Sequence, residues 1–89
     1  MMKIKDGFIL KDVAGSKIVI AIGEERFNFN GVITFNEVGA DVFNMLDGSS
    51  SVEEIVTKIS EEYNAPYEVV KTDVEKLIEK MRKHNLIEE

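Results

Sequence analysis

The spacing of apolar residues changes between residues 26 and 36, and this change divides the chain into two parts. Before it, apolar side chains recur at every second position, as in Phe27-Asn28-Phe29-Asn30, which is typical of a half-buried β-strand. After Asn36 they recur at every third or fourth position, which is typical of helices that bury one face. The pattern predicts an α+β fold in which strands come first and the last strand leads directly into the first helix.

The first part contains three β-prone segments. Residues 7–13 and 17–22 are rich in β-branched side chains, and the glycine-containing stretch 14–16 between them suits a hairpin turn. Residues 23–25 then lead into a third strand over residues 26–30. Because the second segment is almost continuously apolar, we expect it to be the middle strand of a three-stranded antiparallel meander. Phe27 and Phe29 would share one face of the third strand, and we expect both in the core.

The first of three predicted helices begins beside this third strand. Asn36 is our preferred N-cap, and a capping box between Thr34 and Glu37 is the alternative. The helix should end at Asp47-Gly48, because glycine readily adopts the left-handed conformation that follows a helix.

Two further helices follow, each with a recognisable start. Ser51 and Glu54 have the spacing of a capping box, and Pro66 suits the first turn of a third helix. The third helix should end near His84-Asn85, and we expect Leu86-Ile87 to pack back onto the core. The sequence thus predicts one domain, residues 1–89, of three strands followed by three helices.

Composition limits the classes of function that remain. The chain has no cysteine and one histidine, so we expect neither a metal site nor a cofactor. No apolar run approaches the ~20 residues that cross a bilayer, and the N-terminus lacks a signal peptide, so we expect a cytoplasmic protein without a membrane partner. The net charge of −6 opposes non-specific binding to nucleic acid, since neutralised phosphates supply most of that affinity.

No residue pattern indicates catalysis. The glutamate pairs at residues 24–25, 53–54 and 61–62 are adjacent in sequence, and adjacent residues on a helix do not face each other. His84 has no evident serine or aspartate partner and suits a helix end. We therefore expect a protein that is not an enzyme.

The edges of the predicted sheet suggest peptide binding. Lys11 and Asp12 charge the first strand and discourage pairing there, whereas the third strand carries Arg26 with the polar Asn28 and Asn30, which tolerate a neighbouring strand. A peptide added at that edge would gain backbone hydrogen bonds. If the third helix lies beside the edge, its lysines would favour an acidic peptide.

Several segments resemble the PqqD family, whose founding member is the pyrroloquinoline quinone synthesis protein D. They are residues 35–43 (FNEVGADVF), 46–48 (LDG), 52–56 (VEEIV), 73–78 (DVEKLI) and 86–87 (LI). The resemblance implies a recognition element for ribosomally made and post-translationally modified peptides, with a winged helix-turn-helix-like fold. Such a module binds the leader region of a precursor peptide as an added strand. It acts as a peptide chaperone in natural product biosynthesis, passing the peptide to a modifying enzyme such as a radical S-adenosylmethionine (SAM) protein.

The resemblance also implies which residues contact the peptide. The added strand would lie along the third strand, in the groove beside the third helix. The strand residues are Arg26, Phe27, Asn28, Phe29 and Asn30. The helix residues are Val70, Lys71, Val74, Leu77 and Met81, some of which must belong to the core because an amphipathic stripe is more often core than groove.

Two other functions remain as alternatives. The second and third helices, joined by the short stretch 64–66, can be interpreted as a helix-turn-helix of a winged-helix DNA-binding or regulatory module. Against this, acidic side chains at Glu68, Asp73, Glu75 and Glu79 are mixed with the lysines of the third helix. The third possibility is a structural module that forms a homodimer through the same sheet edge.

Overall fold

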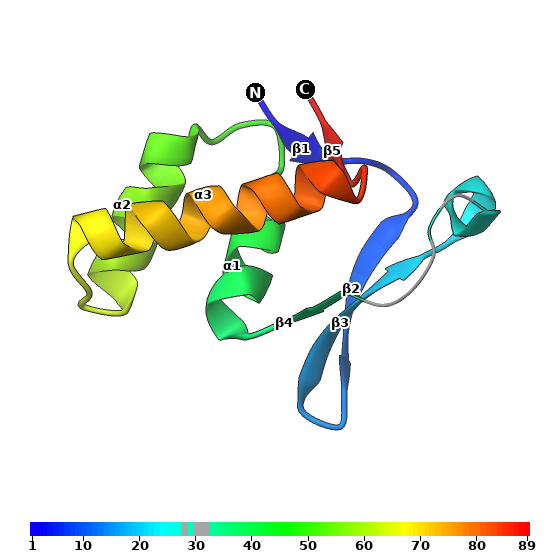
Figure 1. The fold of residues 1–89 in the computed structure, drawn as a ribbon, viewed down its shortest axis with the longest axis horizontal. Helices are drawn as coiled ribbons and strands as arrows, with labels where there is room; N and C mark the ends of the chain where they lie inside the picture. The colour runs from blue at the N-terminus through cyan, green and yellow to red at the C-terminus, as the bar shows by residue number, and fades with distance from the viewer. Residues whose placement is uncertain (28, 30–32) are drawn as a thin grey trace.

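The computed structural model describes residues 1–27, 29 and 33–89. Along the chain it contains the strands β1 (Lys3–Ile4), β2 (Phe8–Val13) and β3 (Ser16–Ala21), a 3₁₀ helix η1 (Gly23–Phe27), and the strand β4 (Ile33–Phe35). These are followed by the helices α1 (Glu37–Met45), α2 (Val52–Glu62) and α3 (Tyr67–Lys83), and by the strand β5 (Ile87–Glu88). Three antiparallel strands followed by three helices confirm the predicted α+β class (Figure 1).

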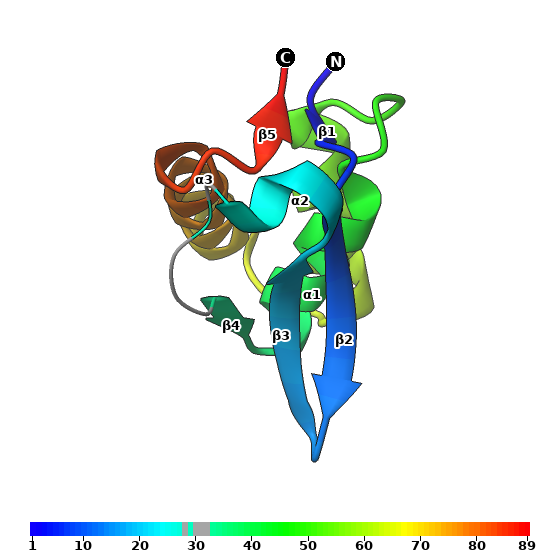
Figure 2. The ribbon, with the colours of Figure 1, turned by 90° about the vertical axis from the view of Figure 1, so that its right-hand side faces the viewer.

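The main sheet has the strand order β2-β3-β4, so β3 is the middle strand, as predicted. β2 and β3 form a hairpin whose two-residue loop has positive φ at both positions, 51° at Ala14 and 84° at Gly15. Positive φ at both loop positions is the backbone of a type I′ turn, whose twist matches that of the flanking strands. The tip of this hairpin projects away from the helices (Figures 1 and 2).

The third strand does not lie where the sequence pattern placed it. Arg26 and Phe27 belong to η1, and the strand that pairs with β3 is Ile33–Phe35. In that strand Ile33 and Phe35 are buried and Thr34 is exposed, which is the alternation expected of a half-buried strand. The prediction was wrong because two short alternating segments compete in this part of the sequence, and the one with Ile33 and Phe35 reaches the core. The predicted strand residues Asn28 and Asn30 lie outside the described residues.

Local capping signals locate the helix starts correctly. The side chain of Asn36 accepts a hydrogen bond from the Gly39 N–H at 2.9 Å, which confirms Asn36 as the N-cap of α1. Ser51 and Glu54 form the predicted capping box of α2. α1 ends at Met45, just before the predicted Asp47-Gly48.

The core lies between one face of the sheet and the three helices, and α3 contacts both α1 and α2. Its fully buried residues of large volume are Ile55, Ile59, Met81, Leu86, Val19, Val42, Val56 and Val74. None of the helices in the described part of the chain is both long and apolar enough to cross a membrane.

The two chain ends lie side by side, where β1 and β5 form a second, two-stranded sheet (Figure 1). Backbone hydrogen bonds from Ile4 to Leu46 and from Lys5 to Leu86 attach this small sheet to the helices. Leu86 and Ile87 are buried, as predicted. The pairing of residues 3–4 with 87–88 has no local sequence signal and was not predicted.

Candidate peptide-binding site

The outer edge of β4 has backbone groups that the sheet does not use. In antiparallel strands, residues alternate between those that bond to one neighbour and those that bond to the other. The two-residue loop makes Val13 and Ser16 a hydrogen-bonded pair. Counting back along the register in steps of two residues leads to the pair Gly7 and Ile22, where the Ile22 N–H donates to the Gly7 carbonyl at 2.7 Å. The even-numbered residues of β3 therefore bond to β2, and its odd-numbered residues bond to β4.

This alternation fixes the direction of the backbone groups in β4. Ile33 pairs with Val19 and Phe35 pairs with Lys17, so both bond to β3. Thr34 lies opposite Ile18, so its N–H and C=O point away from β3 toward the free edge. No described strand pairs with that edge. Thr34 is thus the residue of β4 whose N–H and C=O can both bond to an added strand.

A groove opens beside this edge, between the start of α1 and the C-terminal half of α3. It has a volume of about 350 Å³ and is lined by Asn36, Val38, Asp73, Lys76, Leu77 and Lys80. The Lys80 Nζ lies 5.8 Å from the centroid of the Phe35 ring, a cation–π distance, which links α3 to the end of β4. Figure 2 shows α3 on the β4 side of the sheet, away from β2. Lys80, which lines the groove and lies over the Phe35 ring, therefore connects the groove to the end of β4.

The predicted α3 residues divide between core and surface. Val70, Val74 and Met81 have exposed fractions of 5%, 0% and 0%, so they belong to the core and cannot contact a peptide in this structure. Lys71 is exposed but lines a different hollow, against α2. Leu77 is half-buried and lines the groove beside β4.

The described residues of the predicted third strand, Arg26, Phe27 and Phe29, lie outside β4. Phe27 is 77% exposed in η1, with the Arg26 guanidinium 5.4 Å from its ring centroid, so the expectation that Phe27 is in the core was wrong. Phe29 packs edge-on against the rings of Phe8 and His84, with centroids 5.4 and 6.4 Å away. Phe29 is thus partly buried and packs against the core.

Sequence reasoning missed the groove residues Val38, Lys76 and Lys80, together with the true edge strand. A usable signal existed for the strand, since Ile33-Thr34-Phe35 alternates directly before the helix cap. No sequence signal distinguishes Leu77 and Lys76 from the other residues of α3 until β4 is placed beside them.

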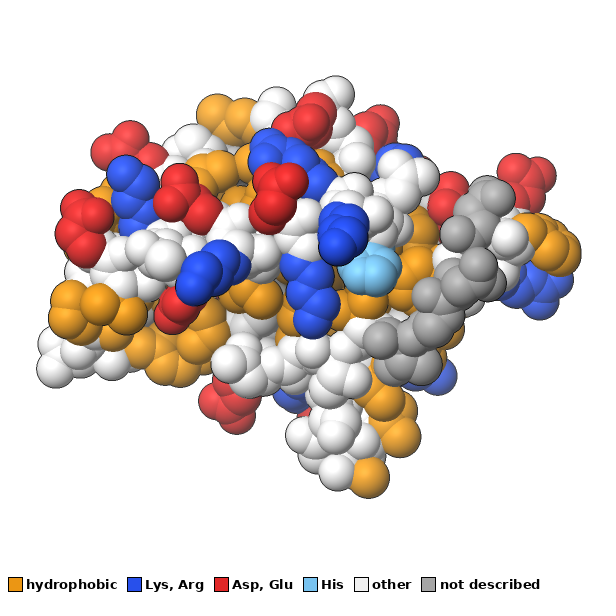
Figure 3. Space-filling model, viewed as in Figure 1, with side chains coloured by type: hydrophobic (Ala, Val, Ile, Leu, Met, Phe, Trp, Pro, Cys, Tyr) orange, Lys and Arg blue, Asp and Glu red, His pale blue; other side chains and the backbone are white. Residues whose placement is uncertain are grey.

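Charge is unevenly distributed along α3. Glu68 lies in its first turn, whereas Lys80, Arg82 and Lys83 lie in its last turn, where positive charge complements the helix dipole. Figure 3 shows Lys and Arg side chains gathered over the C-terminal half of this helix, with acidic side chains among them. This mixture does not resemble the continuous basic face that duplex DNA requires.

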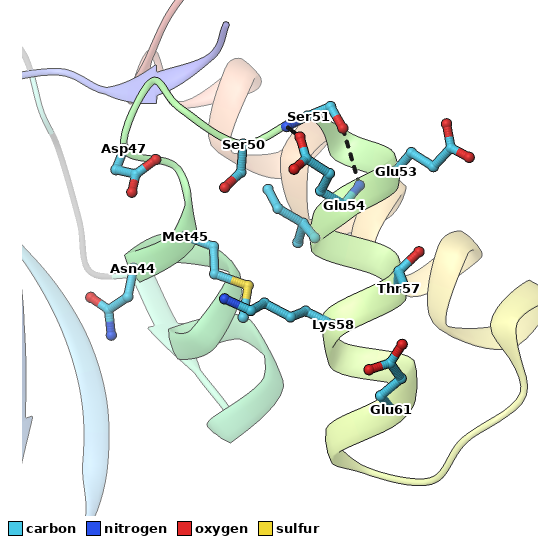
Figure 4. A pocket seen from close by; sticks show the side chains of 11 residues that line it. Asn44, Met45, Asp47, Ser50, Ser51, Glu53, Glu54, Thr57, Lys58 and Glu61 are labelled. Atoms are coloured by element: carbon cyan, nitrogen blue, oxygen red, sulfur yellow. Dashed lines mark hydrogen bonds between the residues drawn. The ribbon is translucent and has the colours of Figure 1, made fainter.

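A larger hollow of about 520 Å³ lies between the end of α1 and α2 (Figure 4). Two of the carboxylates that line it, Asp47 and Glu54, are engaged in local hydrogen bonds. Ser51 donates its backbone N–H to Glu54, and Ser49 donates its hydroxyl and backbone N–H to Asp47; these bonds lower the pKa of each carboxyl. Groups held ionised in this way are poor proton donors at neutral pH. No residue of β4 lines this hollow.

Metal-binding side chains do not cluster in the described part of the chain. Within residues 1–27, 29 and 33–89, no group of three or more His, Cys, Asp or Glu side chains could hold an ion. The ring of His84 packs against Phe29, and His84 forms the C-cap of α3.

Comparisons with known proteins agree with this architecture. A family model described as coenzyme PQQ synthesis protein D (PqqD) matches residues 9–87. A solved structure described as "TbiB1 in Complex with the TbiA(beta) Leader Peptide" has a similar fold, with a TM-score of 0.74 at 20% sequence identity. The similarity covers 97% of this chain and 94% of that chain. The comparison with curated proteins found no match.

Proposed function

Because this chain belongs to the family of coenzyme PQQ synthesis protein D, we propose that it binds the leader region of a ribosomally made precursor peptide. The leader adds as a strand to the free edge of β4, beside α3. The bound peptide is then presented to a modifying enzyme, such as a radical SAM protein. The chain itself performs no catalytic step.

One observation carries this proposal: the N–H and C=O of Thr34 point to the free edge of β4, two residues before Asn36, which lines the groove between α1 and α3. Strand addition needs a free edge for backbone bonds and adjacent pockets for alternate side chains, and this surface has both. The similar structure, whose description includes a leader peptide, supports the same kind of partner.

Because β4 has only three residues, backbone hydrogen bonds can supply only part of the binding free energy. Two backbone bonds at Thr34 contribute about 1–3 kcal/mol together, since each is worth about 0.5–1.5 kcal/mol net. Micromolar binding corresponds to about −8 kcal/mol. Side chains of the peptide must therefore supply most of the affinity by burial in the groove, at about 25 cal/mol per Å² of apolar surface.

Replacement of the Thr34 N–H tests the proposal. The probe is the N-terminal segment of a short peptide encoded next to this gene, labelled and titrated by fluorescence anisotropy. Thr34→Pro removes the outward N–H, and we expect binding at least about tenfold weaker. Proline is tolerated at an outward position of an edge strand, so the fold should persist.

Thr34→Val is the matched control, because it changes the side chain and keeps the N–H. Its affinity should stay within about twofold of that of the wild type. Equal binding by the wild type and Thr34→Pro, with circular dichroism showing both folded, would contradict strand addition at β4.

A further inference from the structure

We propose that the groove beside β4 selects a peptide strand in which an acidic side chain lies two residues from an apolar one. The inference rests on the proposed strand addition and specifies the chemistry of the peptide. It follows from the direction of side chains in an added strand and from the residues that line the groove.

The register determines which peptide side chains enter the groove. Thr34 points its side chain to the outer face of the sheet, whereas Ile33 and Phe35 point inward to the core. A guest residue directly opposite Thr34 points to the same outer face, because paired residues of adjacent strands share a face. Its two sequence neighbours point to the inner side, where α3 lies. The groove thus receives two guest side chains at positions i and i+2.

The apolar part of the groove consists of Val38 and Leu77. Both are half-buried and pack against the core, so each already presents an apolar surface to the groove. An aliphatic or aromatic guest side chain would bury this surface, and burial supplies the largest share of the binding energy. One of the two groove positions is therefore apolar.

The basic part of the groove consists of Lys76 and Lys80. The four ion pairs among the described residues are formed by Lys3, Lys17 and Arg82. Among those residues, neither Lys76 nor Lys80 has a carboxylate oxygen within 4.0 Å of its Nζ. Lys76 and Lys80 are four residues apart on one helix, so their like charges repel each other. A guest carboxylate beside them would reduce this repulsion and gain two charge-assisted contacts.

Asp73 decides at which end of the groove the acidic residue lies. It precedes Leu77 by about one helical turn, and Lys80 follows Leu77 by about one turn. A guest carboxylate near Asp73 would be repelled, whereas one near Lys80 is also close to Phe35 and the β4 edge. The acidic position is therefore the one at the Lys80 end, and the apolar position lies over Leu77.

A selection from a phage-displayed library of short random peptides tests this inference. We expect peptides bound by the wild type to be enriched in Asp or Glu two residues from an aliphatic or aromatic residue. The double variant Lys76→Glu/Lys80→Glu should lose that preference. Its affinity for a selected peptide should fall about threefold to tenfold at low salt, and less at high salt, as expected for partly exposed charges.

Lys71→Glu is the matched control, because it places a new negative charge on α3 but outside the groove. It should retain the affinity and the acidic preference. Equal weakening by Lys71→Glu, or Thr34-dependent binding without any acidic preference, would overturn this inference and leave strand addition intact. Selected peptides that bind Thr34→Pro as well as the wild type, or no enrichment at all, would instead overturn strand addition itself.

Discussion

Gly39 shows how packing at a single residue can reverse a helix propensity. A Cβ at this position would lie 2.8 Å from Phe35 Cδ1 and 2.9 Å from Phe35 Cβ. In an exposed helix, replacing glycine by alanine gains up to about 1 kcal/mol. Here the Phe35 Cβ is fixed by the backbone of β4, so the side chain cannot simply rotate away. We predict that Gly39→Ala lowers the free energy of unfolding by about 1–3 kcal/mol, measured by urea denaturation.

Phe35→Ala provides the test of this mechanism, since it removes Cγ and Cδ1, two of the three Phe35 atoms that the new Cβ would meet. The loss caused by Gly39→Ala should be smaller in the Phe35→Ala background than in the wild type. A stabilising Gly39→Ala would show that the contact between β4 and α1 is looser than the structure indicates.

The ion pair at the hairpin tip predicts a pH dependence. The Lys17 Nζ lies 2.6 Å from Asp12 Oδ2, and this hydrogen bond lowers the pKa of Asp12 below 3.8 and raises that of Lys17 above 10.5. A carboxyl with a lowered pKa in the folded state stabilises that state above its unfolded pKa. The contribution is lost as the pH falls through the folded-state pKa, below 3.8.

We therefore predict that Asp12→Asn is slightly less stable than the wild type at pH 7 and that the difference disappears under acidic conditions. Urea denaturation of both proteins over a series of pH values measures it. The effect is small, because the pair is exposed to solvent. A difference that persists unchanged after the pH has fallen through the lowered folded-state pKa of Asp12 would assign it to the side-chain replacement instead of the charge.

At the scale of elements, the segment from η1 to β4 separates what the sequence predicts from what it does not. The helix caps were predicted correctly because Asn36, Ser51 and Glu54 form hydrogen bonds with residues only three positions away in the sequence. The third strand was misplaced because its position depends on which of Phe27, Phe29 and Phe35 is buried in the core. That choice involves Phe8 on β2 and His84 after α3, which are distant in sequence.

Phe27 and Phe29 provide a matched pair for this element. Phe27 is 77% exposed, whereas Phe29 is half-buried against Phe8. We predict that Phe29→Ala lowers the free energy of unfolding by about 1–3 kcal/mol, less than for a fully buried phenylalanine. Phe27→Ala should change it by less than about 0.5 kcal/mol. Similar losses in both variants would support the original assignment of residues 26–30 to one strand face.

At the scale of the whole molecule, topology determines the site more than any single residue does. α3 carries Val74 and Met81 into the core and Leu77 into the groove, and the sequence pattern could not separate them. The separation depends on where β4 lies, and β4 is positioned by its short register with Lys17–Val19 of β3. The sequence therefore predicted α3 beside the sheet and, among the residues that line the groove, Leu77, whereas it misplaced the third strand.

The arrangement of the sheet also concentrates the proposed activity at one edge. β2 forms the other edge of the main sheet and carries Lys11 and Asp12, and its tip projects away from the helices. A hollow of about 290 Å³ adjoins β2 at Leu10, and α1 and α2 contribute the acidic residues Glu37, Asp41 and Glu62 to its lining. The charges of Lys11 and Asp12 discourage strand pairing along β2, so the β4 edge is the one we propose.

Hydrogen exchange of the Thr34 amide tests the central claim most directly. Its N–H points to the free edge, whereas those of Ile33 and Phe35 point toward β3 and serve as internal references. With saturating leader peptide, we predict that exchange at Thr34 slows by at least about tenfold, because the N–H becomes bonded to the guest strand. Unchanged exchange at Thr34 while the peptide is bound, or new protection confined to β2, would contradict strand addition at β4.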